Sequence, residues 1–428
     1  MSFPAPDSDT FVAALPNGVR VVTIRLPHLD SASVSVFVRT GSRNEGPRLN
    51  GISHVVEHMA FKGTHERDCQ EINLDAERLG AEVNAYTDKD HTAFQMHGLA
   101  RHAGDFVRML GDIVRNGSFP EAELERERQV ILQELQEDDD DAMSTAYKLF
   151  DTACFGRHPM AQPVIGTRRN IERFRRGDLL AYVQRQYSGA NLIVGVAGDV
   201  DPDRVLDEAR AAFGSMPAGE DNTVEPPSYV GGLLSRRHPG SSQSHVVLGY
   251  PIPSLQQDHH ASVVAAALLG EGMSSPLMDR IREQLGLVYY AACSADVMDA
   301  CGQFVIEAST GPERLDEFFT EVGRLLADHA ERTDRVGLER ARNQIAVRTL
   351  RARERPGRRL EDAAQDLFVH GRVRSRAELT GAIESVTGRQ VREAFERMLS
   401  FGPAVAVSGR MKRAVDERVL ETLSGRGA

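Results

Sequence analysis

Two histidines four residues apart, with a glutamate directly before the second, occur in HVVEHMAFKGT at residues 54 to 64. On a helix each residue advances about 100°, so His54 and His58 lie one turn apart on one face, and Glu57 can face the same side. Two imidazoles placed in this way can bind one Zn²⁺, and the carboxylate can take a proton from a zinc-bound water whose pKa the metal lowers. The resulting hydroxide attacks a polarised carbonyl. A solvated or core helix that carries two histidines is the alternative interpretation.

A third metal ligand is expected, because zinc hydrolases use three protein ligands and keep one position open for water. Glu134 lies 76 residues after His58, in a helix that a capping-box pattern at 118–121 opens and that is expected to end near Glu137. Glu127 lies two turns before Glu134 and points to the same side. One of them can bind the metal while the other hydrogen-bonds a histidine or the water. Spacing alone does not choose between them, because this helix is rich in glutamate.

The elements that must position these residues follow an α+β pattern. The first 40 residues read as β structure, with Phe11–Ala14 and Val19–Ile24 on either side of a Pro-Asn-Gly turn signal. The expected elements that follow are a strand at Ser33–Val38, a helix at about 51–62, a strand at Ala93–His97 and a helix at Ala103–Arg115. Strands with interspersed helices predict mostly antiparallel sheets packed with helices.

The chain repeats itself at an offset of roughly 210 residues. Residues 124–135 (LERERQVILQEL) are echoed by 338–350, and residues 191–209 are echoed by 403–422. A duplicated αβ domain follows, with domains predicted at 1–220 and 241–428 and a Pro- and Gly-rich linker at 221–240.

The second half of the chain does not repeat the candidate metal-site residues. Glu127 aligns with Ala341, Glu134 aligns with Arg348, and the second half has no HxxEH. A metal site is therefore expected in the first domain only.

Composition narrows the function classes. The net charge of −11 argues against non-specific binding of nucleic acid, and the absence of tryptophan excludes tryptophan stacking platforms. The four cysteines form no CxxC pair, so no zinc ribbon is expected and the thiols are predicted to be reduced. The first residues lack the pattern of a signal peptide, and no window holds 18 uninterrupted apolar residues, so we expect a cytoplasmic protein with no membrane partner.

The residues of the first half resemble the inverzincins, the pitrilysin or insulysin clan of zinc metallopeptidases, in their mitochondrial-processing-peptidase-like branch. Residues 52–64 match the helix with both histidines and the base. Residues 127–135 match the helix with the third ligand, and the resemblance selects Glu134 as ligand and Glu127 as supporting carboxylate. Residues 80–95 match the loop and edge strand beside the active site. There the resemblance implies that Asn84 and Ala85 hold a substrate backbone by strand addition.

The second half carries a further match to this family. Residues 270–290 (GEGMSSPLMDRIREQLGLVYY) match its glycine-rich segment and its Arg and Tyr pair, at Arg282 and Tyr289. The resemblance implies that this pair binds the substrate carbonyl and supports the oxyanion, as hydrogen-bond donors can. The other interpretation is a surface arginine and a core tyrosine.

The resemblance implies an endopeptidase with one Zn²⁺ per chain that cuts unstructured peptides inside a closed chamber. Each chain would contribute two duplicated αβ domains, half of a clamshell, and would pair as a homodimer or as a heterodimer with a related subunit. Two alternatives remain: a partner or scaffold subunit of a heterodimeric peptidase of the same family, and a zinc hydrolase of small molecules.

Overall fold

The computed structural model describes residues 7–412 and 414–424. The chain forms two compact units, and each unit is assembled from three separate stretches of sequence. Unit 1 consists of the residues up to Leu135, Gln162–Val224 and Arg351–Arg376; unit 2 consists of Gln136–Ala161, Glu225–Leu350 and the residues from Ala377 onward. The domain boundaries predicted from the sequence, 1–220 and 241–428 with a linker at 221–240, follow the sequence duplication. They stay a prediction.

Unit 1 is built on a mixed, mostly antiparallel sheet. Within the described residues this sheet has six strands, in the spatial order β1 (Thr10–Ala14), β2 (Arg20–Arg25), β6 (Leu192–Gly198), β3 (Ser31–Val38), β5 (Thr92–Leu99) and β4 (Glu82–Thr87). Only the β2–β6 pairing is parallel. The strands expected near Phe11, Val19, Ser33 and Ala93 are all present, with ends that differ by at most two residues.

Helices cover both faces of this sheet. They are α1 (Ile52–Ala60), α2 (Cys69–Arg78), α3 (Ala103–Arg115), α4 (Glu121–Asp140, which belongs to unit 1 up to Leu135), α6 (Arg168–Arg173), α7 (Arg176–Gln186), α8 (Pro202–Phe213) and α12 (Pro356–His370). Successive strand residues point to opposite faces. Accordingly, Val36 packs in the core formed with α1, α3, α4 and α7, and Phe37 packs in the core formed with α12.

Unit 2 repeats this sheet with one strand fewer among the described residues. Its order is β7 (Gly232–Arg237), β11 (Ala404–Gly409), β8 (Ser244–Ile252), β10 (Gly302–Thr310) and β9 (Val288–Val297). The β7–β11 pairing is parallel and the others are antiparallel, which matches β2–β6–β3–β5–β4 strand for strand.

The helices of unit 2 also form two layers. They are α5 (Ala142–Phe155), α9 (His260–Gly270), α10 (Leu315–Glu331), α11 (Arg335–Arg353, in unit 2 up to Leu350), α13 (Arg376–Ser385, in unit 2 from Ala377), α14 (Gly388–Phe401) and α15 (Arg418–Leu423). Val246 and Leu248 pack in the core with α9, α10 and α14, whereas Val247 between them packs in the core with α5.

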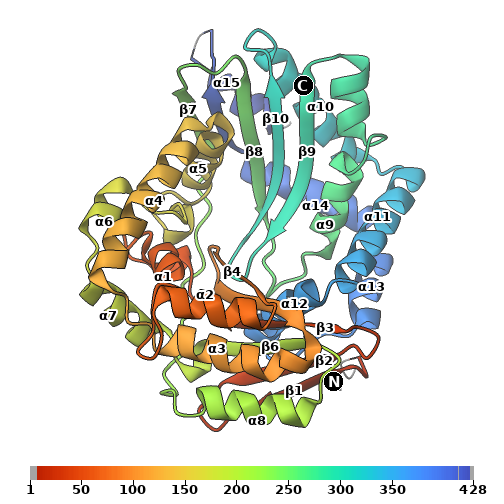
Figure 1. Cartoon of the computed structure of the whole chain (residues 1–428). Coiled ribbons are helices and arrows are strands. Elements are labelled where there is room, and N and C mark those ends of the chain that lie inside the picture. The colour runs from red at the N-terminus through yellow and green to blue at the C-terminus, as the bar shows by residue number, and fades with distance from the viewer. Residues whose placement is uncertain (1–6, 413, 425–428) are drawn as a thin grey trace. The chain divides into compact units, whose positions relative to one another are not determined.

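Each unit takes one covering helix from the other half of the sequence. Helix α12, blue in Figure 1, lies on the sheet of unit 1 among elements from the start of the chain. Helix α5, from the first half, packs on β11, β8 and β7 of unit 2 (Figure 1). This exchange was not predicted, because nothing in a helix's own periodicity says which of two similar sheets it covers.

The two sequence echoes fall on corresponding elements. Residues 124–135 lie in α4 and their echo lies in α11, while 191–209 cover β6 and α8 and the described part of their echo covers β11 and α15. The predicted α+β fold, with two duplicated domains that each pack a mostly antiparallel sheet with helices, is confirmed. No helix within the described residues is long and apolar enough to cross a membrane.

Candidate metal centre

Helix α1 presents the HxxEH residues on the face opposite its core contacts. Ile52, Val55, Val56 and Met59 are buried in the main core of unit 1, as their helical spacing requires. His54 and His58 lie one turn apart on another face, and their rings meet edge to face with centroids 4.6 Å apart. The predicted one-sided arrangement of the two imidazoles is therefore present.

The start of α1 is fixed by a buried carboxylate that sequence reasoning missed. Glu45, 1 % exposed, accepts hydrogen bonds from the backbone N–H of Gly51 (2.7 Å) and of Ser53 (2.8 Å), and from the Asn50 side chain (3.1 Å). These are helix N-terminal N–H groups that have no intrahelical partner. Gly51 has φ +97, and a Cβ there would lie 2.8 Å from the Cα of Gly166, so both backbone conformation and space require glycine.

Three ligand-type atoms converge above α1. Nε2 of His54 lies 3.8 Å from Oε2 of Glu134 on α4, and Nε2 of His58 lies 3.5 Å from the same oxygen. One ligand atom from each of the three residues lies within 4.8 Å of the others. Zinc ligands about 2.0–2.2 Å from the ion at tetrahedral angles lie roughly 3.4 Å from one another, so the observed spacing suits this ion.

Glu127 holds the imidazole of His58 in place. Its Oε2 lies 3.2 Å from Nδ1 of His58, which leaves Nε2 of His58 facing Glu134. Its Oε1 pairs with Nζ of Lys62 at 2.7 Å. An acceptor on the second ring nitrogen of a ligating histidine fixes both tautomer and ring orientation. The structure thus places Glu127 beside His58 and Glu134 at the convergence point.

Electrostatics favour the protonation states that a metal needs. Burial, and then the nearby charge of His58, lower the pKa of His54 to about 4, which keeps its imidazole neutral. Burial would raise the pKa of Glu127, but hydrogen bonds from Lys62 and His58 outweigh it and lower the pKa below its usual value. Burial raises the pKa of Glu57, against a hydrogen bond from Thr87, and the nearby Glu134 carboxylate raises it further.

Two buried polar atoms at the cluster have no hydrogen-bond partner among the described residues. They are Oε2 of Glu57 and Nδ1 of His54. An unpaired buried acceptor or donor costs roughly 1–3 kcal/mol, so a group that supplies a partner at this position is expected. Oε2 of Glu57 suits a water on the ion, and the two imidazoles with the Glu134 carboxylate, the donor set of many zinc hydrolases, suit Zn²⁺ itself.

Asn84 and Ala85 lie on β4, the edge strand of the unit 1 sheet. The backbone N–H of Ala85 donates to the side-chain oxygen of Asn84 at 2.9 Å. An edge strand offers unpaired backbone groups to which an extended peptide can add. Helix α1 contacts both β4 and β5, so this edge belongs to the surroundings of the histidines.

Arg282 and Tyr289 lie in unit 2. Arg282 belongs to η5 (Met278–Gln284), which packs against β9, and its guanidinium approaches Glu283 (3.7 Å) and the sulfur of Met273 (3.6 Å). Tyr289, on β9, is 80 % exposed. The alternative of a core tyrosine is therefore wrong, and the phenol is free to meet a ligand.

Sequence reasoning missed three residues around the cluster. Lys62, two residues past the end of α1, pairs with Glu127. Thr87 follows Ala85 by two residues and so shares its face of β4. No local spacing pointed to Glu45, which lies outside the helix that it caps.

Comparison with known proteins agrees with this geometry. Residues 20–168 match the family described as Insulinase (Peptidase family M16), and residues 173–345 match the Peptidase M16 inactive domain. A relative named an uncharacterized zinc protease, from Rickettsia bellii, is 31 % identical over 93 % of this chain and 97 % of its own. Another of that description, from Mycobacterium bovis, is 33 % identical over 95 % of this chain and 94 % of its own.

A solved structure supports the fold. The crystal structure of a protease from Helicobacter pylori superimposes with a TM-score of 0.83 at 22 % identity, and covers 93 % of this chain and 99 % of that one. The metal-site motif lies inside the matched insulinase region, and the second unit, which lacks HxxEH, overlaps the region matched by the inactive domain. The chain belongs to peptidase family M16, the insulinase family, and its relatives include proteins named as zinc proteases.

Proposed function

We propose that this protein is a zinc-dependent endopeptidase that hydrolyses unstructured peptides inside a closed chamber, with one Zn²⁺ per chain. One observation carries the proposal: Nε2 of His54, Nε2 of His58 and Oε2 of Glu134 converge beside a buried carboxylate oxygen of Glu57 that has no partner among the described residues. Zinc, when bound, supplies Lewis-acid activation of water and of the substrate carbonyl.

Each residue of the site has a distinct task. His54, His58 and Glu134 hold the ion, and Glu127 orients the ring of His58. Glu57 acts as general base: its Oε2 accepts a proton from the attacking water and delivers it to the leaving nitrogen. The elevated pKa of Glu57 suits this exchange, because a general base works best when its pKa lies near the operating pH.

Substrate contacts come from both halves of the chain in this proposal. A peptide would add to the β4 edge at Asn84 and Ala85 by backbone hydrogen bonds. Arg282 and Tyr289 would donate hydrogen bonds to the scissile carbonyl oxygen as negative charge develops on it. The exposed phenol of Tyr289 is consistent with this task. Tyr289→Phe should lower kcat by roughly 10²-fold, as removal of one oxyanion donor does.

The partner is proposed to be a second copy of the chain. Both HxxEH and the Arg and Tyr pair occur in this one sequence, so two copies suffice without a different subunit. Light scattering on the purified protein distinguishes a homodimer from a chain that awaits a related partner.

Glu57→Gln tests the proposal. The variant should retain one zinc per chain and lose turnover of an unstructured peptide, because glutamine cannot accept the proton. Glu125→Gln, on the exposed side of α4, is the control and should cleave at the wild-type rate. A Glu57→Gln enzyme that cuts as fast as the wild type would remove Glu57 from the mechanism.

A further inference from the structure

The strand that carries Tyr289 changes its side-chain alternation at that residue. Along β9, Ala291 and Cys293 pack in the core with α9, α10 and α14, as residues two apart on a strand should. Val288 packs in the same core, although it lies three residues before Ala291. Tyr289 and Tyr290, which follow Val288, both lie outside that core and are 80 % and 46 % exposed.

A β-bulge causes this change. On β10, Ser309 pairs with Tyr290, whereas the next residue, Thr310, pairs with Val288. Among the described strand pairs, Tyr289 is therefore an extra residue that faces no residue of β10. A bulge redirects the side chain of its extra residue, and bulges are frequent beside active sites. The outward direction of the Tyr289 phenol follows from the bulge.

The chain before the bulge is fixed by side chains of the same unit. The hydroxyl of Thr310 donates to the carbonyl of Leu287 at 2.6 Å, and Leu287 itself is buried. The guanidinium of Arg314 donates to the two backbone carbonyls before Leu287, each at 3.2 Å. These bonds hold the N-terminal side of the bulge.

Glu307 holds the other side of the bulge. The phenol of Tyr290 donates to its Oε1 and the phenol of Tyr147 on α5 donates to its Oε2, both at 2.5 Å. The bond to Glu307, and then burial, raise the pKa of Tyr290 to about 12, and burial, then the bond to Glu307, raise the pKa of Tyr147. Both phenols therefore stay protonated and donate. Hydrogen bonds of about 2.5–2.7 Å from a hydroxyl to an ionised carboxylate are roughly twice as strong as bonds between neutral groups.

These three residues, Tyr147, Glu307 and Tyr290, form the Glu307 cluster, which connects the edge strand to the interior of unit 2. Helix α5 packs on β11, β8 and β7, and its residues Ala146 and Phe150 are buried. Strand β10, with Glu307, is paired with β8 on one side and with β9 on the other. The carboxylate thus joins a fixed helix to the strand end that carries the bulge.

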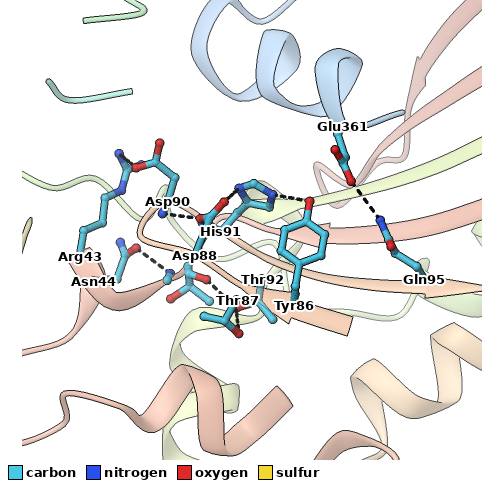
Figure 2. Close-up of polar contacts among 12 residues, drawn as sticks. Arg43, Asn44, Tyr86, Thr87, Asp88, Asp90, His91, Thr92, Gln95 and Glu361 are labelled. Atoms are coloured by element: carbon cyan, nitrogen blue, oxygen red, sulfur yellow. Dashed lines mark hydrogen bonds and ion pairs between the residues drawn. The ribbon is translucent and has the colours of Figure 1, made fainter. Parts of the chain in front are cut away.

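The corresponding edge of unit 1 is built differently. There the edge strand β4 pairs with β5 in unbroken register from Glu82 to Thr87. Gln95 of β5 reaches the covering helix α12 through a contact of 3.5 Å with Glu361 (Figure 2), longer than the usual range of about 2.7–3.2 Å for an N–H···O bond. The two short carboxylate bonds therefore accompany the bulge and are not a feature of the shared architecture.

We propose that Glu307 is a positioning residue for the oxyanion donor Tyr289: it fixes Tyr290 by a hydrogen bond and, with it, the bulge that turns the Tyr289 phenol outward. This inference rests on the proposed function, in which Tyr289 donates to the scissile carbonyl oxygen. A donor that is held in place before the reaction stabilises the developing charge without a cost of reorganisation.

Tyr290→Phe tests the proposal, because it removes one bond of the Glu307 cluster and keeps the aromatic ring. With zinc content equal in all samples, it should lower kcat by about 10-fold with KM unchanged, a part of the roughly 10²-fold that one oxyanion donor is worth. In a Tyr289→Phe background the same change should have no further effect, because the hydroxyl that it positions is absent. A purely structural role would lower kcat equally in both backgrounds.

Tyr229→Phe is the matched control. It removes a phenol of unit 2 that donates to the carbonyl of Gly402 at 3.0 Å, and it should keep wild-type kcat. Hydrogen exchange adds a readout that does not depend on activity. The backbone amides of residues 287–293, followed by mass spectrometry of peptides, should exchange faster in Tyr290→Phe than in the wild type and in Tyr229→Phe.

Three results would each overturn the proposal: wild-type kcat in Tyr290→Phe, an equal loss of kcat with and without the Tyr289 hydroxyl, or unchanged exchange at residues 287–293. If the wild type shows no chelator-sensitive cleavage, the proposed function fails, and the catalytic task of Glu307 fails with it. The exchange rates then still decide whether Glu307 holds the bulge.

Discussion

Replacement of Glu45 by glutamine should change how folding stability depends on pH. Glu45 is 1 % exposed, and burial raises its pKa from 4.5 to about 7, against hydrogen bonds from Ser53, Gly51 and Asn50 that favour the charged form. In the unfolded chain this carboxyl titrates near 4.5. A pKa that is higher in the folded state means that the folded protein binds the proton more tightly.

The contribution of Glu45 to stability is fully present below pH 4.5 and is lost progressively as the pH rises toward about 7, because the unfolded chain releases its proton first. Each pKa unit is worth about 1.4 kcal/mol, so the total loss is about 3 kcal/mol, most of it between pH 5 and pH 8. Glutamine does not titrate and lacks this loss.

Denaturant unfolding at several pH values in the presence of a chelator measures the effect without bound metal. The unfolding free energy of Glu45→Gln minus that of the wild type should rise by about 2–3 kcal/mol from pH 5 to pH 8. The difference removes the contributions of other titrating groups, such as His54, that both proteins share. An equal pH slope in the two proteins would refute the reasoning, and would mean that the hydrogen bonds at the start of α1 offset the burial of the charge.

Three further outcomes are expected. Glu127→Ala should weaken zinc binding by about 10- to 100-fold in chelator competition, because His58 loses the carboxylate oxygen that lies 3.2 Å from its Nδ1 and orients its ring. Unchanged zinc affinity would mean that Glu127 pairs with Lys62 but does not orient His58 for the metal. Glu134→Ala should lose zinc on dialysis, measured by metal analysis, since it removes one of three ligands; one zinc per chain after dialysis would point to a different third ligand. Leu360→Ala should lower the free energy of unfolding, measured with denaturant, by about 2–5 kcal/mol, because this side chain of α12 is fully buried against the unit 1 sheet. The control Leu74→Ala, at a position that is 55 % exposed, should change the free energy of unfolding little.

Much of the fold was predictable because its signals are local. The spacing in HVVEH predicted a helix with both imidazoles on one face, and the turn signal after Ala14 separated two strands, which pair antiparallel in the structure. The duplication was visible because two echoes kept nearly one offset, and the matching strand orders of the two sheets explain why. Helix boundaries differed by only a few residues, as at α4, which continues past Glu137 to Asp140.

The remaining features depend on contacts between distant residues. Helix spacing placed Glu127 and Glu134 on one side of α4 but did not say which meets the histidines, and the family resemblance supplied that choice. Glu45 acts on α1 from outside the helix, through hydrogen bonds from Gly51 and Ser53. The exchange of α5 and α12 follows from which sheet face each helix covers, a property of the packed chain rather than of either helix.

The central claim is tested most directly by cleavage of a fluorescence-quenched, unstructured peptide by the purified chain alone, with metal content measured on the same sample. Cleavage that a chelator abolishes and added Zn²⁺ restores is the predicted result. A sample that holds one zinc per chain and leaves the peptide intact would contradict a self-sufficient endopeptidase, and would favour a subunit that acts only with a related partner.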